Sequence, residues 1–172
     1  MERFLETVAD LFDVGRKVTR IGDSVLRLLP QILSRLHILE QCPDSSQALS
    51  RLLVHLTKIV NSRTASPSRI KCALNSLCSL LGCNRDSLTW RTAMQLIVRS
   101  LSSPLPVVRR AAAEGLYENV CLTEVDDQVL LLLSETVWQD TSPTAMVSIH
   151  DAAHTVERIL LMEAESSKAM LS

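Results

Sequence analysis

Apolar side chains recur along almost the whole chain at the three- and four-residue spacing that forms one face of an α-helix. No stretch alternates convincingly between apolar and polar residues, as a half-buried β-strand would. The pattern predicts an all-α protein, and a helix holding the apolar run Val129–Leu133 should pack on more than one side. The predicted helices cover residues 2–14, 23–40, 46–61, 67–81, 86–102, 106–120, 125–138 and 143–164.

Capping residues and prolines mark several of these boundaries. The segment Pro-Asp-Ser-Ser at 43–46 offers side-chain oxygens that can cap the helix that follows. Pro67 and Pro106 fall in a first helical turn, where a missing N–H group is tolerated. Gly82 suits the C-terminal end of a helix, whereas Pro30 predicts a kink or a boundary.

A sequence repeat groups the helices. Segments 67–77 and 106–116, offset by 39 residues, share a proline, a basic residue, an alanine and a leucine. A weaker copy follows at an offset of 40, with Pro143 displaced upstream. The equivalent positions are Lys71, Arg110 and His150; Ala73, Ala112 and Ala152; and Leu77, Leu116 and Val156. Because helix pairs recur every ~40 residues in HEAT repeats, we expect a HEAT- or armadillo-like solenoid of antiparallel helix pairs, with an irregular bundle as the alternative.

Composition agrees with a leucine-packed helical protein. Of the 172 residues, 29 are leucine, five are aromatic and four are glycine. So few glycines argue against tight β-turns and against phosphate-binding loops. The length fits one domain or one short repeat array. We therefore expect a single helical-repeat domain over 1–172, with residues 1–22 forming either an N-terminal extension or a preceding helix.

The formal net charge of −1 hides a strong asymmetry along the chain. Residues 1–57 are balanced, residues 58–110 carry nine basic side chains against one acid, and residues 111–172 carry two basic side chains against eleven acids. This split indicates solvated helix faces, pairing between the segments, or a charged partner. Nucleic acid is not the expected partner, because the whole chain is slightly acidic and Trp90 is the only aromatic residue of the basic segment.

Three features predict a cytoplasmic protein. The longest apolar run has five residues, whereas a membrane span needs ~18. Four acidic side chains lie in the first thirteen residues, where a signal peptide would have a basic start. The five cysteines form no C-x-x-C pair, and Cys78 has the helical spacing of a core residue. We expect reduced cysteines and no membrane association.

One segment resembles a zinc-binding helix. His150 and His154 lie four residues apart on one helical face that Glu157 continues, as in the H-E-x-x-H motif. The intervening acid is Asp151 rather than a glutamate, and His150 occupies the basic position of the repeat. We therefore expect no metal site and no cofactor. Because G-x-G-x-x-G, P-loop and G-x-S-x-G motifs are also absent, we expect a protein that is not an enzyme, with a helical metal-dependent hydrolase as the alternative.

Two segments of the C-terminal half share a more specific pattern. The first runs SPLPVVRR at 103–110 and continues as EGLYE at 114–118, and the second is LLSETVW at 132–138. Together they closely resemble the C-terminal domain of tubulin folding cofactor D, also called tubulin-specific chaperone D. The matching positions are Pro104, Val107, Arg109, Arg110, Tyr117, Glu118, Ser134, Thr136 and Trp138. Residues 25–102 resemble the same domain more loosely, through their helix pattern and the segment LPQILSRLHIL.

The resemblance implies a HEAT-repeat scaffold in the cytoplasm, associated with the cytoskeleton. Members of this family capture β-tubulin and, with tubulin cofactors C and E and an Arf-like small GTPase, assemble or take apart the αβ-tubulin heterodimer. GTP hydrolysis is stimulated in that assembly, but the nucleotide site belongs to tubulin. Members are much longer proteins, so we expect this chain to correspond to one domain of them. The alternative is a HEAT-repeat adaptor unrelated to tubulin.

Five residues are candidates for contacting a partner: Arg99, Arg109, Arg110, Tyr117 and Trp138. The two consecutive arginines open a helix, and one of them can hold an inter-repeat contact while the other is free for a partner. The sequence does not tell these two apart. Tyr117 and Trp138 have an alternative role as packing residues with a polar edge at the surface. Because tubulin is acidic, the basic segment is also expected to steer association.

Overall fold

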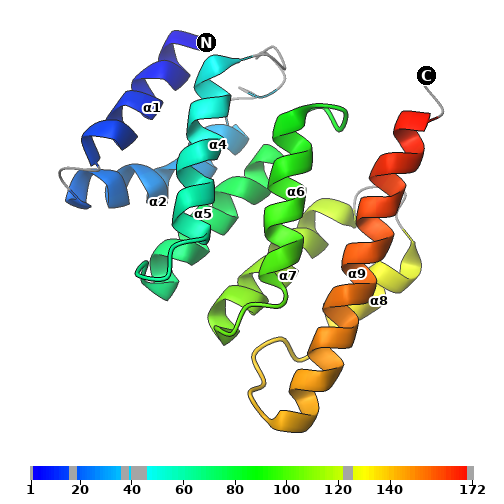
Figure 1. Ribbon diagram of the computed structural model, residues 1–172. Coiled ribbons are helices and arrows are strands. Elements are labelled where there is room, and N and C mark those ends of the chain that lie inside the picture. Colours follow the sequence, from blue (N-terminus) through cyan, green and yellow to red (C-terminus); the bar gives the residue numbers. More distant parts are fainter. Residues whose placement is uncertain (1, 16–18, 36–38, 40–45, 122–125, 170–172) are drawn as a thin grey trace. The chain divides into compact units, whose positions relative to one another are not determined.

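The computed structural model describes residues 2–15, 19–35, 39, 46–121 and 126–169 (Figure 1). Within these ranges the regular elements are all α-helices and no strand is present, which confirms the prediction of an all-α protein. The helices are α1 (Glu2–Gly15), α2 (Thr19–Arg35), α4 (Gln47–Val60), α5 (Pro67–Leu80), α6 (Leu88–Ser100), α7 (Pro106–Val120), α8 (Asp127–Glu135) and α9 (Pro143–Ala169). None of the described helices combines the length and the apolar character needed to cross a bilayer.

Side-chain caps begin several helices where the sequence predicts them. Ser46 precedes α4, and its hydroxyl oxygen accepts the backbone N–H of Leu49 at 3.3 Å. Ser66 caps α5 in the same way and is followed by Pro67, which takes the first helical position. Such caps satisfy N–H groups that have no partner within the helix. Proline also opens α7, whose range of 106–120 is the predicted one.

Three predicted helix boundaries are wrong by three residues or more, and one of them is the end of α9, expected at residue 164 and observed at Ala169. The helix expected at 23–40 begins four residues earlier, at Thr19, and the described part ends at Arg35. Pro30 lies inside this helix, so it does not form a boundary. The helix expected to reach residue 138 ends at Glu135, because the chain turns away at the next residue. Gly82 follows the end of α5 without a positive φ, so no left-handed glycine cap is needed there.

The chain divides into two compact units, Met1–Ala93 and Met94–Ser172, and each is described by itself. In the N-terminal unit, α1 packs against α2 and α4, while α5 packs against α2 and α4 (Figure 1). These four helices therefore form two layers, α1–α2 and α4–α5. Their core is mostly leucine, and its fully buried members are Leu5, Leu26, Leu29, Leu33, Leu52, Leu56, Leu74, Leu77 and Leu80.

A pair of glycines allows α1 and α2 to approach each other closely. A Cβ atom on Gly15 would lie 2.5 Å from the Cα atom of Gly22 and 2.7 Å from its nitrogen. The reverse contact is looser, since a Cβ atom on Gly22 would lie 3.3 Å from the Cα atom of Gly15. Position 15 can therefore hold only glycine unless one of the two backbones moves.

In the C-terminal unit, α8 packs against both α7 and α9. The apolar run of α8 thus has neighbours on more than one side, as the sequence predicts. Val129 and Leu133 are buried at these contacts, whereas Leu131 is 53% exposed. The run is therefore not enclosed all round, and one side of α8 faces solvent.

The three helices of the repeat share one pattern of burial. Each of α5, α7 and α9 begins with a proline, and each exposes the basic residue of the repeat while burying its alanine and its branched residue. The exposed residues are Lys71, Arg110 and His150, and the buried residues are Ala73, Leu77, Ala112, Leu116, Ala152 and Val156. The sequence repeat therefore predicts correctly which face each helix buries.

Candidate partner-binding cleft

Helices α7 and α8 and the turn at 136–139 surround a cleft of about 480 Å³. Apolar side chains form much of its lining, and two of them are exposed: Tyr117 at 41% and Val137 at 62%. The complete lining consists of Arg110, Ala113, Glu114, Tyr117, Leu133, Ser134, Thr136, Val137, Trp138 and Gln139. An exposed aromatic ring beside buried apolar side chains, with polar groups around them, is the composition of many protein-binding sites.

Arg109 does not line the cleft but holds the turn beside it. Its side chain is fully buried, and its three nitrogens donate to three backbone carbonyl groups. Nε donates to Trp138 at 2.8 Å, Nη1 to Ser103 at 2.9 Å and Nη2 to Asp140 at 2.6 Å. Since a buried charge is tolerated only when it is well hydrogen-bonded, these contacts fix the turn against the start of α7.

The turn is also closed back onto the end of α8. The indole Nε1 of Trp138 donates to the carbonyl of Leu133 at 3.0 Å, and the backbone N–H of Thr136 donates to the carbonyl of Leu132 at 3.3 Å. These bonds satisfy carbonyl groups that the end of a helix leaves without partners. Trp138 is only 5% exposed, so it packs beneath the cleft surface with its polar edge bonded internally.

Asp140 continues this network into the start of α9. One of its carboxylate oxygens accepts the backbone N–H of Ser142 at 2.8 Å. The hydrogen bonds from Ser142 lower the pKa of Asp140 below its ordinary value, and the positive charge of Arg109 adds to the effect. The carboxylate is thus held in its charged form next to the buried guanidinium.

Arg110 has the opposite environment to its neighbour in sequence. Its side chain is 56% exposed, and its Nε donates to an oxygen of Glu114 at 2.6 Å. Its Nη1 donates to the side-chain oxygen of Gln139 at 3.2 Å, which links α7 to the turn. The structure therefore distinguishes the two arginines that the sequence could not: Arg109 is an internal residue, and Arg110 is accessible at the cleft.

The structure brings together three of the five predicted contact residues. Arg110, Tyr117 and Trp138 line the same cleft, whereas Arg109 is buried beside it and Arg99 is exposed on α6 outside the lining. The prediction missed Val137, the most exposed apolar residue of the cleft. The sequence predicts a helix that continues to residue 138, and this prediction gives Val137 no special role. In the structure the helix ends at Glu135, and the turn after it exposes Val137 to solvent.

The histidines of α9 do not assemble a metal site in the described part of the chain. His150 and His154 are exposed, and Nδ1 of His150 lies 3.3 Å from the carbonyl oxygen of Met146 in the preceding turn. Glu157 is half-buried on the same helix. No group of three or more histidine, cysteine, aspartate or glutamate side chains in the described residues is arranged to hold a metal ion.

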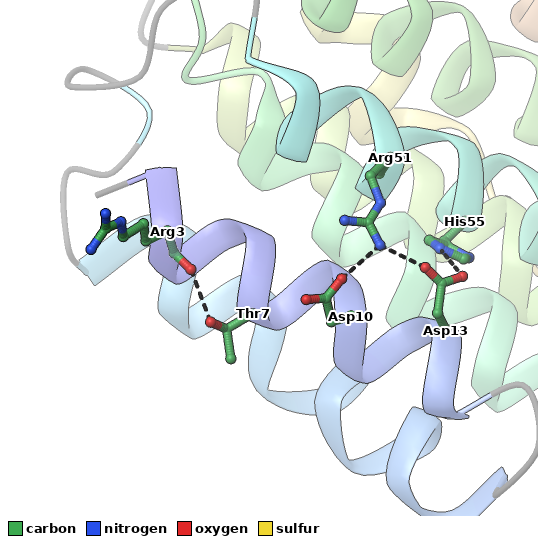
Figure 2. Close-up of polar contacts among 6 residues, drawn as sticks. All are labelled: Arg3, Thr7, Asp10, Asp13, Arg51 and His55. Atoms are coloured by element: carbon green, nitrogen blue, oxygen red, sulfur yellow. Dashed lines mark hydrogen bonds and ion pairs between the residues drawn. The ribbon is translucent and has the colours of Figure 1, made fainter.

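A separate polar cluster joins α1 to α4 in the N-terminal unit (Figure 2). Arg51 donates through Nη2 to Asp10 at 2.8 Å and to Asp13 at 2.7 Å, which raises its pKa. Nε2 of His55 lies 3.3 Å from a carboxylate oxygen of Asp13, and its ring stacks on that of Phe12 with centroids 5.7 Å apart. The cluster lies at the surface and links the two helices through side chains.

No family model matches the chain, and no solved structure matches it.

Proposed function

We propose that this chain is a solenoid domain of the tubulin folding cofactor D type, which binds a partner through the cleft between α7 and α8. In this role it belongs to a cytoplasmic scaffold that holds β-tubulin during assembly or disassembly of the αβ-tubulin heterodimer. Tubulin cofactors C and E and an Arf-like small GTPase are the other proposed partners. The domain acts by binding, and the GTP hydrolysed in the assembly is bound to tubulin.

Two features support the solenoid. In the N-terminal unit α1 lies against α4 and α2 lies against α5, which is how successive helix pairs stack in helical repeats. The shared burial pattern of α5, α7 and α9 is a second feature, since a solenoid repeats the same core positions in each helix pair. Both agree with the repeat of about 40 residues.

The convergence of the family-like residues at one cleft carries the proposal. The resemblance lies in two separate segments, 103–118 and 132–138, yet five of its nine positions line the same cleft. These five are Arg110, Tyr117, Ser134, Thr136 and Trp138. A sixth, Arg109, holds the turn that contributes Val137. Most of the residues that resemble the family therefore lie at one cleft, where Tyr117 is exposed and has the aromatic character of residues that dominate many protein interfaces.

Direct binding tests the proposal. The purified 172-residue chain is measured by biolayer interferometry against αβ-tubulin, cofactor C, cofactor E and the Arf-like GTPase, each immobilised separately. We expect binding to at least one of them, weakened about tenfold or more by Val137→Asp, because the charge would be buried at the contact. Val147→Asp is the matched control, since Val147 is equally exposed in the same unit but lies outside the cleft.

Each other result has a definite meaning. If the folded chain binds none of the four proteins, the tubulin-related function is wrong and an unrelated adaptor is the better description. If it binds one of them and both variants bind as well as the original chain, the function stands and the cleft is not the site.

A further inference from the structure

Helix α2 carries two neighbouring apolar stripes, of which only one is buried. The buried stripe consists of Gly22, Leu26, Leu29 and Leu33. Each residue of the second stripe directly precedes one residue of the buried stripe in the sequence. The second stripe consists of Ile21, Val25, Leu28 and Ile32. All four members of the second stripe are half-buried or exposed, and Leu28 is 54% exposed. Both stripes follow the i, i+4, i+7, i+11 spacing of a face that packs against another helix.

Helix α1 adds two exposed apolar residues to this surface. Phe4 and Leu11 are seven residues apart and therefore share one side of the helix. Both are about two-fifths exposed, at 41% and 39%. We call these two residues and the second stripe of α2 the outer face of the α1–α2 layer.

The outer face points away from the α4–α5 layer. Two residues of helix turn the side chain by about 200°, so residues i and i+2 lie on nearly opposite sides. Asp23 follows Ile21, the first residue of the second stripe, by two positions and pairs with Arg69 of α5 at 3.2 Å. Ser34 follows Ile32, the last residue of that stripe, by two positions, and its hydroxyl contacts the hydroxyl of Ser79 on α5 at 3.2 Å. The side of α2 opposite the stripe is therefore the side that meets α5.

The same argument places the apolar side of α1. Asp13 follows Leu11 by two positions and contacts Arg51 and His55 of α4 (Figure 2). Leu11 therefore lies on the side of α1 that is turned away from α4. The exposed apolar residues of both helices thus lie on one side of their layer, rather than scattered over the unit.

A basic row borders the outer face. On α2, the row one position before the stripe consists of Arg20, Ser24, Arg27 and Gln31, all exposed, and it contains no acid. The whole N-terminal unit has thirteen basic and eight acidic side chains. An apolar stripe bordered by positive charge is complementary to an apolar stripe bordered by negative charge.

We propose that the outer face docks an amphipathic helix of a partner protein, with its apolar stripe flanked by aspartate or glutamate. The helical spacing of the stripe fits a helix laid along it, as in complexes where an amphipathic helix lies on an apolar surface. The bordering arginines select the charge of the partner. This docking site belongs to the N-terminal unit, so it does not depend on the cleft or on the tubulin-related function.

Two fluorescein-labelled synthetic peptides test the proposal. Both carry the same helical stripe of leucine and isoleucine, flanked in one by glutamates and in the other by lysines. Measured by fluorescence anisotropy with the whole chain, the glutamate peptide is expected to bind about tenfold or more tightly than the lysine peptide. Leu28→Asp should weaken the glutamate peptide by a similar factor. Leu88→Asp is the control, because Leu88 is 77% exposed in the same unit and lies outside the outer face.

A charge-reversed variant makes the test independent of any loss of packing. Arg20→Glu combined with Arg27→Glu changes only exposed side chains and should reverse the preference between the two peptides. Equal affinities for both peptides, or no binding of the glutamate peptide, would overturn the proposal. Two further results would replace the proposed occupant of the outer face. If the chain self-associates and Leu28→Asp abolishes this, the occupant is a second copy of the chain. If the chain sediments with phosphatidylserine vesicles and Leu28→Asp abolishes this, the occupant is a membrane.

Discussion

The two units leave apolar side chains exposed in different forms. The N-terminal unit presents an apolar stripe along α2, extended by two residues of α1 and bordered on α2 by Arg20 and Arg27. The C-terminal unit presents a cleft between α7 and α8. Their charges are also opposite, with an excess of five basic side chains in residues 1–93 and of six acidic ones in residues 94–172. The comparison teaches that helices built on one repeated burial pattern leave exposed surfaces of different form and opposite charge.

The units also differ in how their helices are fastened. In the N-terminal unit the polar link between α1 and α4 is an exposed arginine, Arg51, bound to two carboxylates. In the C-terminal unit the link is a buried arginine, Arg109, bound to three carbonyl groups. Exposed ion pairs contribute little because water competes for both partners, whereas a buried polar group that loses its partner costs much more. We therefore expect the contribution of each arginine to the free energy of unfolding to depend on its burial rather than on its number of hydrogen bonds.

Replacing the buried arginine should have the largest effect. Arg109→Met keeps an unbranched side chain but leaves three carbonyl groups without their donor, so we expect a loss of about 3 kcal/mol or more in the free energy of unfolding. Arg51→Met, the matched change in the other unit, should cost much less, because water competes for both partners of an exposed ion pair. Urea denaturation followed by circular dichroism measures both. Equal losses for the two variants would contradict the ranking.

The glycine crossing of α1 and α2 should come next. In Gly15→Ala the new methyl group would meet the backbone of Gly22 at 2.5 Å, and separating the helices to admit it should cost about 1–3 kcal/mol. Gly82→Ala is the control, because its Cβ atom would meet nothing closer than 3.4 Å. The same denaturation measurement applies. A Gly15→Ala variant as stable as Gly82→Ala would show that α1 and α2 separate more easily than this crossing implies.

These contacts also show which features of the protein the sequence could predict. Hydrophobic spacing and prolines predict the helices and the buried face of α5, α7 and α9, because both signals are local. The clamp by Arg109 joins α7 to a turn about thirty residues later, and no local signal separates it from Arg110. The role of Val137 likewise depends on where α8 ends. The closeness of Gly15 and Gly22 requires knowing how two helices cross, which spacing along one helix does not give.

The smallest expected effect concerns acid stability and tests whether the network around Arg109 reaches the start of α9. The pKa of Asp140 is lower in the folded chain than its ordinary value of 3.8, because its carboxylate accepts hydrogen bonds from Ser142 and lies near Arg109. A lowered pKa means that the stabilisation is present above the ordinary value and is lost as the pH falls through the folded one. Asp140→Asn should therefore lower the thermal midpoint at pH 6, and its difference from the original chain should shrink on acidification to about pH 2.

Asp151→Asn, at an exposed acid of the same unit, should leave the midpoint nearly unchanged. A difference for Asp140→Asn that stays constant from pH 6 to pH 2 would show that the amide loses packing rather than charge, and the electrostatic link between the turn and α9 would then be wrong.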